Sequence, residues 1–95
     1  MKPVVLAARA NRDLAEIMAF ISENAPEAAM RVERRLRERA TGIAQFPSMG
    51  ALRPDGLSRL LPVAATPYSL IYREEPERIT ILHIWHGARG WPPVS

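Results

Sequence analysis

Arginine and histidine are the residue types in this chain best suited to binding anions and moving protons. Twelve of the 13 basic residues are Arg, whose planar guanidinium suits bidentate contacts with carboxylate or phosphate. The two histidines, His83 and His86, are too few for an all-histidine metal site. The chain has no Cys, which excludes disulfides, thiolate catalysis and Cys-ligated zinc. We therefore expect no metal and no cofactor.

The positive charge is concentrated in one short stretch of the sequence. The net charge is +3, and residues 31–39 alone hold five Arg against two Glu, which is the same excess. Such a stretch is either a solvated helix face or a surface for an acidic partner. The preference for Arg also fits a general compositional bias, since Ala and Pro are abundant too.

The spacing of apolar residues predicts a strand and two helices in the first half. Residues 3–7 form a short apolar run that is typical of a strand. Helical spacing follows, with Asn11 as a suitable N-cap, Asp13 placed to interact with the helix dipole, and Asn24 as a stop. A second helix should begin at Pro26, because Pro is well tolerated at the first helical position. The short connection predicts an antiparallel helical hairpin.

The second half of the sequence predicts three strands. Pro-Asp-Gly at 54–56 is the strongest turn signal in a loop over 47–56. Strands are expected at 57–65, 68–74 and 78–86, and the short turns between them predict an antiparallel meander. The last strand is apolar on both faces, which is typical of a central strand that is covered on both sides.

This order of elements predicts a single α+β domain over residues 1–95, with the helical hairpin on one face of the sheet. The hairpin can cover only one face, so apolar and Arg side chains on the other face favour a partner surface. No apolar run approaches the ~18 residues of a membrane span, and the N-terminal run is too short for a signal peptide. We therefore expect a cytoplasmic protein without a membrane partner.

Six short stretches are spread over nearly the whole chain, and they are residues 10–17, 24–29, 46–50, 56–59, 68–73 and 81–92. In their order and spacing they resemble the ParE/RelE superfamily of bacterial type II toxins. The resemblance implies the fold described above and a small toxin that is neutralised by an antitoxin encoded beside it. RelE-like members cut messenger RNA on the ribosome, whereas ParE-like members inhibit DNA gyrase and perform no chemistry of their own.

The similarity to RelE-like ribonucleases is partial. Metal-free RNA cleavage needs a base for the 2′-OH, cations for the charged phosphorane and an acid for the leaving oxygen. Arg59 and Arg89 match two basic positions, but Leu61 and Ser69 stand where further basic residues are expected. The C-terminal tail offers no Tyr or His as the acid or base. If the chain is a ribonuclease, its catalytic residues are Arg59, His86 and Arg89.

The two histidines also have structural interpretations. They are three residues apart, so on a regular strand they face opposite sides of the sheet. His83 shares a face with Ile79 and Ile81 on that pattern, which indicates a core position. His86 stands where the strand ends, where it could cap the strand or pack under the tail.

The missing acid or base favours a ParE-like inhibitor of DNA gyrase over a messenger RNA endoribonuclease. Binding needs only a shaped surface, and Arg and Trp are typical hot-spot residues. We expect Arg89, Trp91 and His86 to contact the target, with segment 86–93 and the second helix as candidate surfaces. Alternatively, Arg89 pairs with a nearby Glu and Trp91 pins the tail to the sheet. An inactive toxin relic is a third interpretation.

In each case the resemblance implies an acidic and flexible antitoxin as partner. It would place an amphipathic segment in the groove between the helical hairpin and the sheet. Its candidate contacts on this chain are basic, and they are Arg31, Arg35, Arg39, Arg59 and Arg73. No small-molecule ligand is expected.

Overall fold

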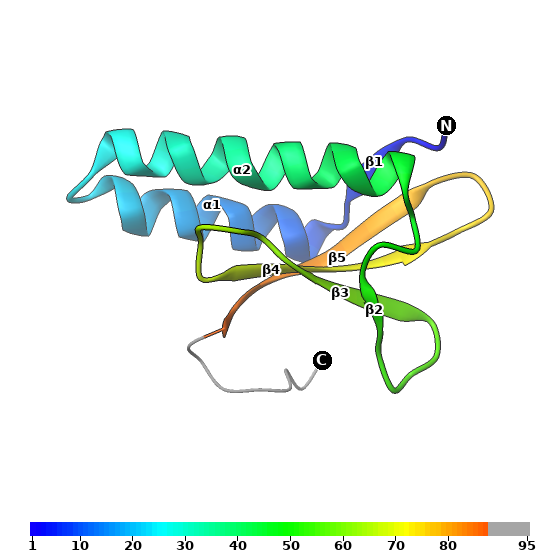
Figure 1. Cartoon of the computed structure of the whole chain (residues 1–95). Coiled ribbons are helices and arrows are strands. Elements are labelled where there is room, and N and C mark those ends of the chain that lie inside the picture. Colours follow the sequence, from blue (N-terminus) through cyan, green and yellow to red (C-terminus); the bar gives the residue numbers. More distant parts are fainter. Residues whose placement is uncertain (88–95) are drawn as a thin grey trace.

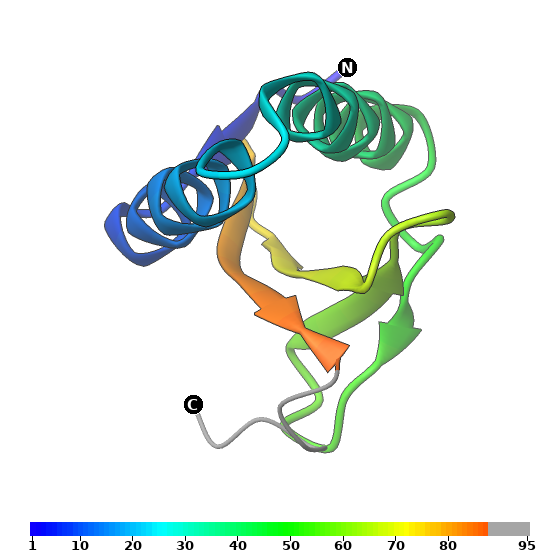
Figure 2. The same cartoon turned by 90° about the vertical axis from the view of Figure 1, so that its left-hand side faces the viewer.

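The fold is a five-stranded sheet with two helices on one of its faces (Figures 1 and 2). The computed structural model describes residues 1–87. In chain order the elements are β1 (Val4–Leu6), α1 (Ala8–Ser22), α2 (Pro26–Gln45), β2 (Ala51–Leu52), β3 (Ser58–Pro62), β4 (Tyr68–Glu74) and β5 (Ile79–His86). The strands lie in the order β1-β5-β4-β3-β2. This confirms the α+β prediction, with its helical hairpin and antiparallel meander.

The last strand, β5, is central over its first half, as predicted. It pairs with β4 in antiparallel fashion and with β1 in parallel, with Val4 opposite Ile79 and Leu6 opposite Ile81. Because β1 ends at Leu6, no described strand continues along this side of β5 beyond Ile81. Helix α1 starts at once after β1 and lies against that side.

Several boundaries differ from the sequence predictions. The strand expected at 57–65 is shorter and ends at Pro62. Helix α1 begins at Ala8, so Asn11 lies inside the helix, where its side-chain amide donates to the Leu6 carbonyl at 3.4 Å instead of capping. The reason is that the chain turns directly from the sheet into the helix, with Ala7 N–H donating to the Ile81 carbonyl at 2.9 Å. The loop expected over 47–56 also contains the two-residue strand β2, which is too short to show a periodic pattern.

A bulge in β5 overturns the predicted position of His83. Ile71 lies opposite His83 but Tyr72 lies opposite Ile81, so Leu82 is an extra residue on β5. An extra residue reverses the alternation of side chains along the rest of the strand. Ile84 therefore takes the place on the core face, and His83 does not share the face of Ile79 and Ile81.

The main core lies between the helices and the sheet, and Tyr72 is at its centre with no exposed surface. The Tyr72 hydroxyl donates to the Pro47 carbonyl at 2.7 Å and accepts from the Gly50 N–H at 2.8 Å. A Cβ at position 50 would lie 2.9 Å from the Tyr72 ring, which explains why Gly fits there. One buried side chain thus fixes the chain between α2 and β2.

Candidate functional site

Arg59 is held by backbone carbonyls near β2. It lies on β3 opposite Tyr72, and its Nη1 donates to the carbonyls of Gly50 at 2.8 Å and Ser48 at 3.4 Å. Together with the Tyr72 hydroxyl, it fixes the segment that leads into β2. Arg59 is both a catalytic and an antitoxin-binding candidate from the sequence, and either role would compete with these hydrogen bonds.

His86 packs against an aromatic ring at the other end of β4. It lies opposite Tyr68, and the two rings meet edge to face with centroids 5.1 Å apart and an interplanar angle of 88°. Arg59 is aligned with Tyr72, four residues further along β4, which is about 13 Å at ~3.3 Å per residue. The fold does not bring the His86 and Arg59 side chains together.

The other sequence-predicted target contacts, Arg89 and Trp91, lie outside the described residues. Of the candidate segment 86–93, the structure describes His86 and Gly87 alone.

Arg73 belongs to a polar network at the β4–β5 turn. Its Nη2 lies 2.9 Å from Oε2 of Glu75, whose other oxygen accepts from Thr80 Oγ1 at 2.6 Å and from Arg78 Nε at 3.2 Å. The Thr80 hydroxyl and the Arg73 guanidinium hold the pKa of Glu75 below its ordinary value. As an antitoxin-binding candidate, Arg73 therefore already has an acidic partner within the chain.

The remaining three antitoxin-binding candidates form a row on α2. Arg31, Arg35 and Arg39 are four residues apart, so they follow one edge of the helix. Arg39 shows which edge this is, because its Nε donates to the carbonyl of Pro62 at the end of β3, at 3.3 Å. Arg31 and Arg35 are exposed and make no ion pair or side-chain hydrogen bond with any residue of 1–87.

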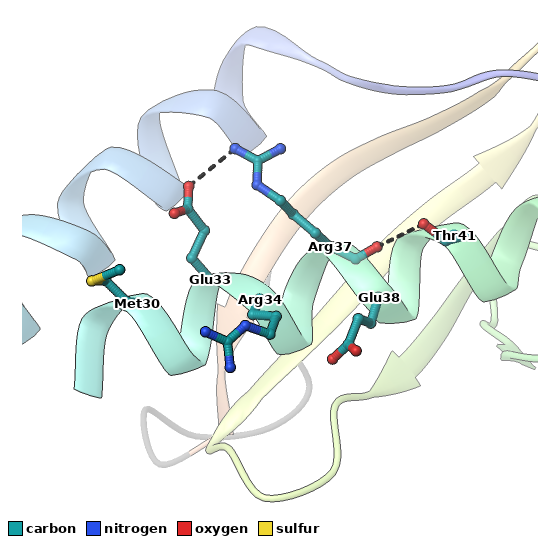
Figure 3. A pocket seen from close by; sticks show the side chains of 6 residues that line it. All are labelled: Met30, Glu33, Arg34, Arg37, Glu38 and Thr41. Carbon is teal, nitrogen blue, oxygen red and sulfur yellow. Dashed lines mark hydrogen bonds and ion pairs between the residues drawn. The ribbon is translucent and has the colours of Figure 1, made fainter. Parts of the chain in front are cut away.

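The outer face of α2 carries a shallow hollow of about 380 Å³ (Figure 3). Two glutamates and two arginines line it together with one methionine and one threonine, and these residues are Met30, Glu33, Arg34, Arg37, Glu38 and Thr41. Arg37 pairs with Glu33 at 3.0 Å. The charges of this face balance, so it offers no excess for an acidic partner.

An apolar hollow of about 500 Å³ lies on the opposite side of α2 from the arginine row. Leu14 of α1, Ala40 and Ala44 of α2, and Val4 and Leu6 of β1 are among the residues that line it. It matches the predicted groove between the hairpin and the sheet. However, the arginines expected beside that groove lie along the β3 edge of α2 and not along the β1 edge.

Asp13 has a role other than the predicted interaction with the helix dipole. Its Oδ2 accepts the Ile84 N–H at 3.0 Å and contacts Nδ1 of His83, and the Asp13 and His83 side chains are only 14% and 17% exposed. Because α1 begins at Ala8, Asp13 is not in the first turn and serves the sheet rather than the helix dipole. No spacing rule connects two residues that far apart in sequence.

Comparison with known proteins identifies the family. A sequence model of the ParE toxin of the type II toxin-antitoxin system, parDE, matches residues 4–91. The chain belongs to this family. A solved structure of the chromosomal ParDE TA system from P. aeruginosa is similar, with a TM-score of 0.77 and 26% identity over 90% of this chain and 96% of that one.

Two relatives of this ParE-family toxin are toxins by name. Toxin Y4kP of Sinorhizobium fredii is 36% identical over 88 residues, which are 90% of this chain and 88% of the relative. Toxin RelE2 of Caulobacter vibrioides is 35% identical over 89 residues, which are 94% and 99% of the two chains.

Membership of a type II toxin–antitoxin family implies a cognate antitoxin as partner. Within residues 1–87 of this ParE-family toxin, no helix is long and apolar enough to cross a membrane.

Proposed function

We propose that this toxin acts in the cytoplasm, where it stops bacterial growth by binding DNA gyrase and catalyses no reaction itself. The observation that carries the proposal is the separation of Arg59 and His86. These are the described members of the trio that a ribonuclease would need, and about 13 Å of β4 lies between their positions.

The bonding of each residue supports the same proposal. A phosphate-binding guanidinium must present free N–H groups, but Nη1 of Arg59 is directed at two backbone carbonyls. A general acid or base must reach the reacting oxygen, but the His86 ring packs against Tyr68, which is 5% exposed. Neither arrangement hinders a protein that acts only by binding.

The target-contacting surface in this proposal is the C-terminal segment with Arg89, Trp91 and His86. Arg and Trp side chains are enriched among the residues that dominate binding energies. The antitoxin is the second partner, and it is expected to be acidic. Its candidate contacts are Arg31, Arg35 and Arg39, with Arg59 and Arg73 available only if their internal bonds open.

A ribosome-dependent messenger RNA endoribonuclease is the alternative function. The names of the relatives RelE2 and RelE3 favour it, and the latter is 33% identical over 87 residues.

The deciding experiment compares macromolecular synthesis after brief expression of the toxin without its antitoxin. We expect DNA synthesis to stop first and cells to form filaments, and we expect the purified toxin to inhibit supercoiling by purified gyrase. An early loss of protein synthesis, with messenger RNA cut at the ribosome, would instead support the ribonuclease. An Arg89→Ala, Trp91→Ala variant serves as the control, since it should lose gyrase inhibition while remaining folded.

A further inference from the structure

We propose that the β3 edge of α2 and the segment after it form one elongated docking surface with a charged end and an apolar end. The antitoxin segment would bind it in a fixed orientation, with acidic side chains against Arg31 and Arg35 and apolar side chains against Phe46 and Met49. We call this surface the arginine–apolar band, and its residues are Arg31, Arg35, Arg39, Phe46, Met49 and Leu52. The inference rests on the antitoxin partner and not on the identity of the target.

Helix geometry makes the band continuous. Arg31, Arg35 and Arg39 follow one another at intervals of four residues, which keeps them on one edge of α2. Phe46 is the residue directly after the helix, seven residues beyond Arg39. The hydrogen bond from Arg39 to the Pro62 carbonyl turns this edge toward β3. From position 31 to position 46 the band is about 22 Å long, at 1.5 Å per residue.

The charged end lacks a partner within the described chain. Arginines four residues apart on a helix repel each other, and within residues 1–87 neither Arg31 nor Arg35 forms an ion pair that would offset this. Elsewhere on α2 the charges balance, and Arg37 has its own partner in Glu33. The positive excess of the helix is therefore placed on the β3 edge, where carboxylates of a bound segment would relieve the repulsion.

The apolar end exposes three large side chains. Phe46 is 64% exposed, Leu52 55% and Met49 37%. The Met49 terminal methyl lies 3.6 Å from where a Cβ of Gly42 would be, which places Met49 against α2. Leu52 lies opposite Arg59 on the neighbouring strand. Exposed apolar side chains gathered at one place indicate an interaction surface.

The charged and apolar ends together favour a peptide segment over a nucleic acid as the ligand of the band. A nucleic acid could bind the arginines through its phosphates, but it would leave the apolar end uncovered. A segment with acidic residues at one end and apolar residues at the other would satisfy both. A length of about 22 Å corresponds to ~15 residues of helix or ~7 residues of extended chain. The structure thus assigns the register of the antitoxin along α2, with its acidic part nearer the hairpin tip.

Matched variants test the charged end. Arg35→Glu lies in the band, whereas Arg34→Glu is the same change one residue away on the charge-balanced outer face (Figure 3). Affinity for the purified cognate antitoxin would be measured by calorimetry at two salt concentrations. We expect Arg35→Glu to weaken binding about tenfold more than Arg34→Glu, and to reduce the salt dependence, because it replaces an attraction by a repulsion.

A second pair of variants tests the apolar end. Phe46→Ser removes the exposed ring in the band, and Phe20→Ser removes a ring that is 73% exposed on α1, outside the band. Both sites are exposed, so both variants should fold. We expect a loss of about tenfold or more in affinity for Phe46→Ser and little change for Phe20→Ser.

The orientation can be read by crosslinking. The chain has no Cys, so a single Cys introduced at position 31 or 52 would be the only site at which a thiol-reactive photocrosslinker attaches. Position 31 should capture the acidic part of the antitoxin and position 52 its apolar part.

The reverse capture, or equal effects within both variant pairs, would overturn the proposed arginine–apolar band while leaving the toxin–antitoxin pair intact. Failure of the unmodified toxin to bind the antitoxin would overturn the partner itself, and binding of an RNA or DNA oligonucleotide with the same arginine dependence would replace it.

Discussion

Asp13 and His83, 70 residues apart in sequence, are hydrogen-bonded partners at the edge of the sheet. The same Asp13 oxygen accepts the Ile84 N–H, so one carboxylate takes the position that a neighbouring strand would fill. This happens just beyond the end of β1, where β5 would otherwise present unpaired backbone groups. The contact ties α1 to β5 and closes part of that edge.

Removal of the Asp13 carboxylate should therefore destabilise the fold. Asp13→Ala leaves the Ile84 N–H without its partner in a largely buried place, and we expect a loss of about 1–3 kcal/mol in the free energy of unfolding. Urea unfolding followed by circular dichroism measures this loss. Arg9→Ala is the control. Arg9 Nε lies 3.8 Å from Asp13 Oδ1, but the Arg9 side chain is mostly exposed, so this variant should change the free energy of unfolding little. Equal losses for the two variants would contradict this account.

The Tyr72 hydroxyl should be the main anchor of the segment before β2. Tyr72→Phe keeps the ring but leaves the Gly50 N–H and the Pro47 carbonyl without their partner, and we expect a loss of about 1–3 kcal/mol. Gly50→Ala should also destabilise, because its Cβ would meet the Tyr72 hydroxyl at 2.9 Å. Since the two changes act on one contact, the double variant should lose less than the sum of the single losses, whereas additive losses would argue that the sites are independent.

Asp55 should make folding sensitive to acid. Its carboxylate accepts hydrogen bonds from the Ser58 hydroxyl and from the N–H groups of Ser58 and Leu57. These bonds lower the pKa of Asp55 to about 2, and the bond from the Ser58 hydroxyl has the largest effect. A lowered folded-state pKa adds stability above the ordinary value of 3.8, and this stability is lost as the pH falls toward 2. Urea midpoints measured between pH 5 and 2 should fall less for Asp55→Asn than for the unchanged protein, and parallel curves would contradict the prediction.

Arg59 should contribute to stability rather than to toxicity. Arg59→Gln loses charge-assisted hydrogen bonds to the Gly50 and Ser48 carbonyls, so we expect a loss on the order of 1–2 kcal/mol. At a temperature where the variant is folded, it should inhibit purified gyrase as strongly as the unchanged toxin. A folded variant that has lost toxicity, together with loss of messenger RNA cleavage, would favour the ribonuclease instead.

The two helices and four of the five strands could be predicted from the sequence in their observed order, whereas β2 could not. Apolar residues at helical spacing, Pro26 at the start of α2 and the turns between strands act locally, so they can be read without the fold. The arginine excess of residues 31–39 was also visible. The family could be recognised from short matching stretches that cover nearly the whole chain.

Which side chains contact each other depends on the tertiary structure. The extra residue Leu82 moved His83 off the core face, and no periodicity rule predicts a bulge inside an apolar strand. Arg59 and Arg73 were equal in the sequence to Arg31 and Arg35, but the fold gives the first two internal partners and leaves the others exposed. The physical reason is that hydrogen bonds and ion pairs depend on distances between elements, which helix and strand periods do not contain.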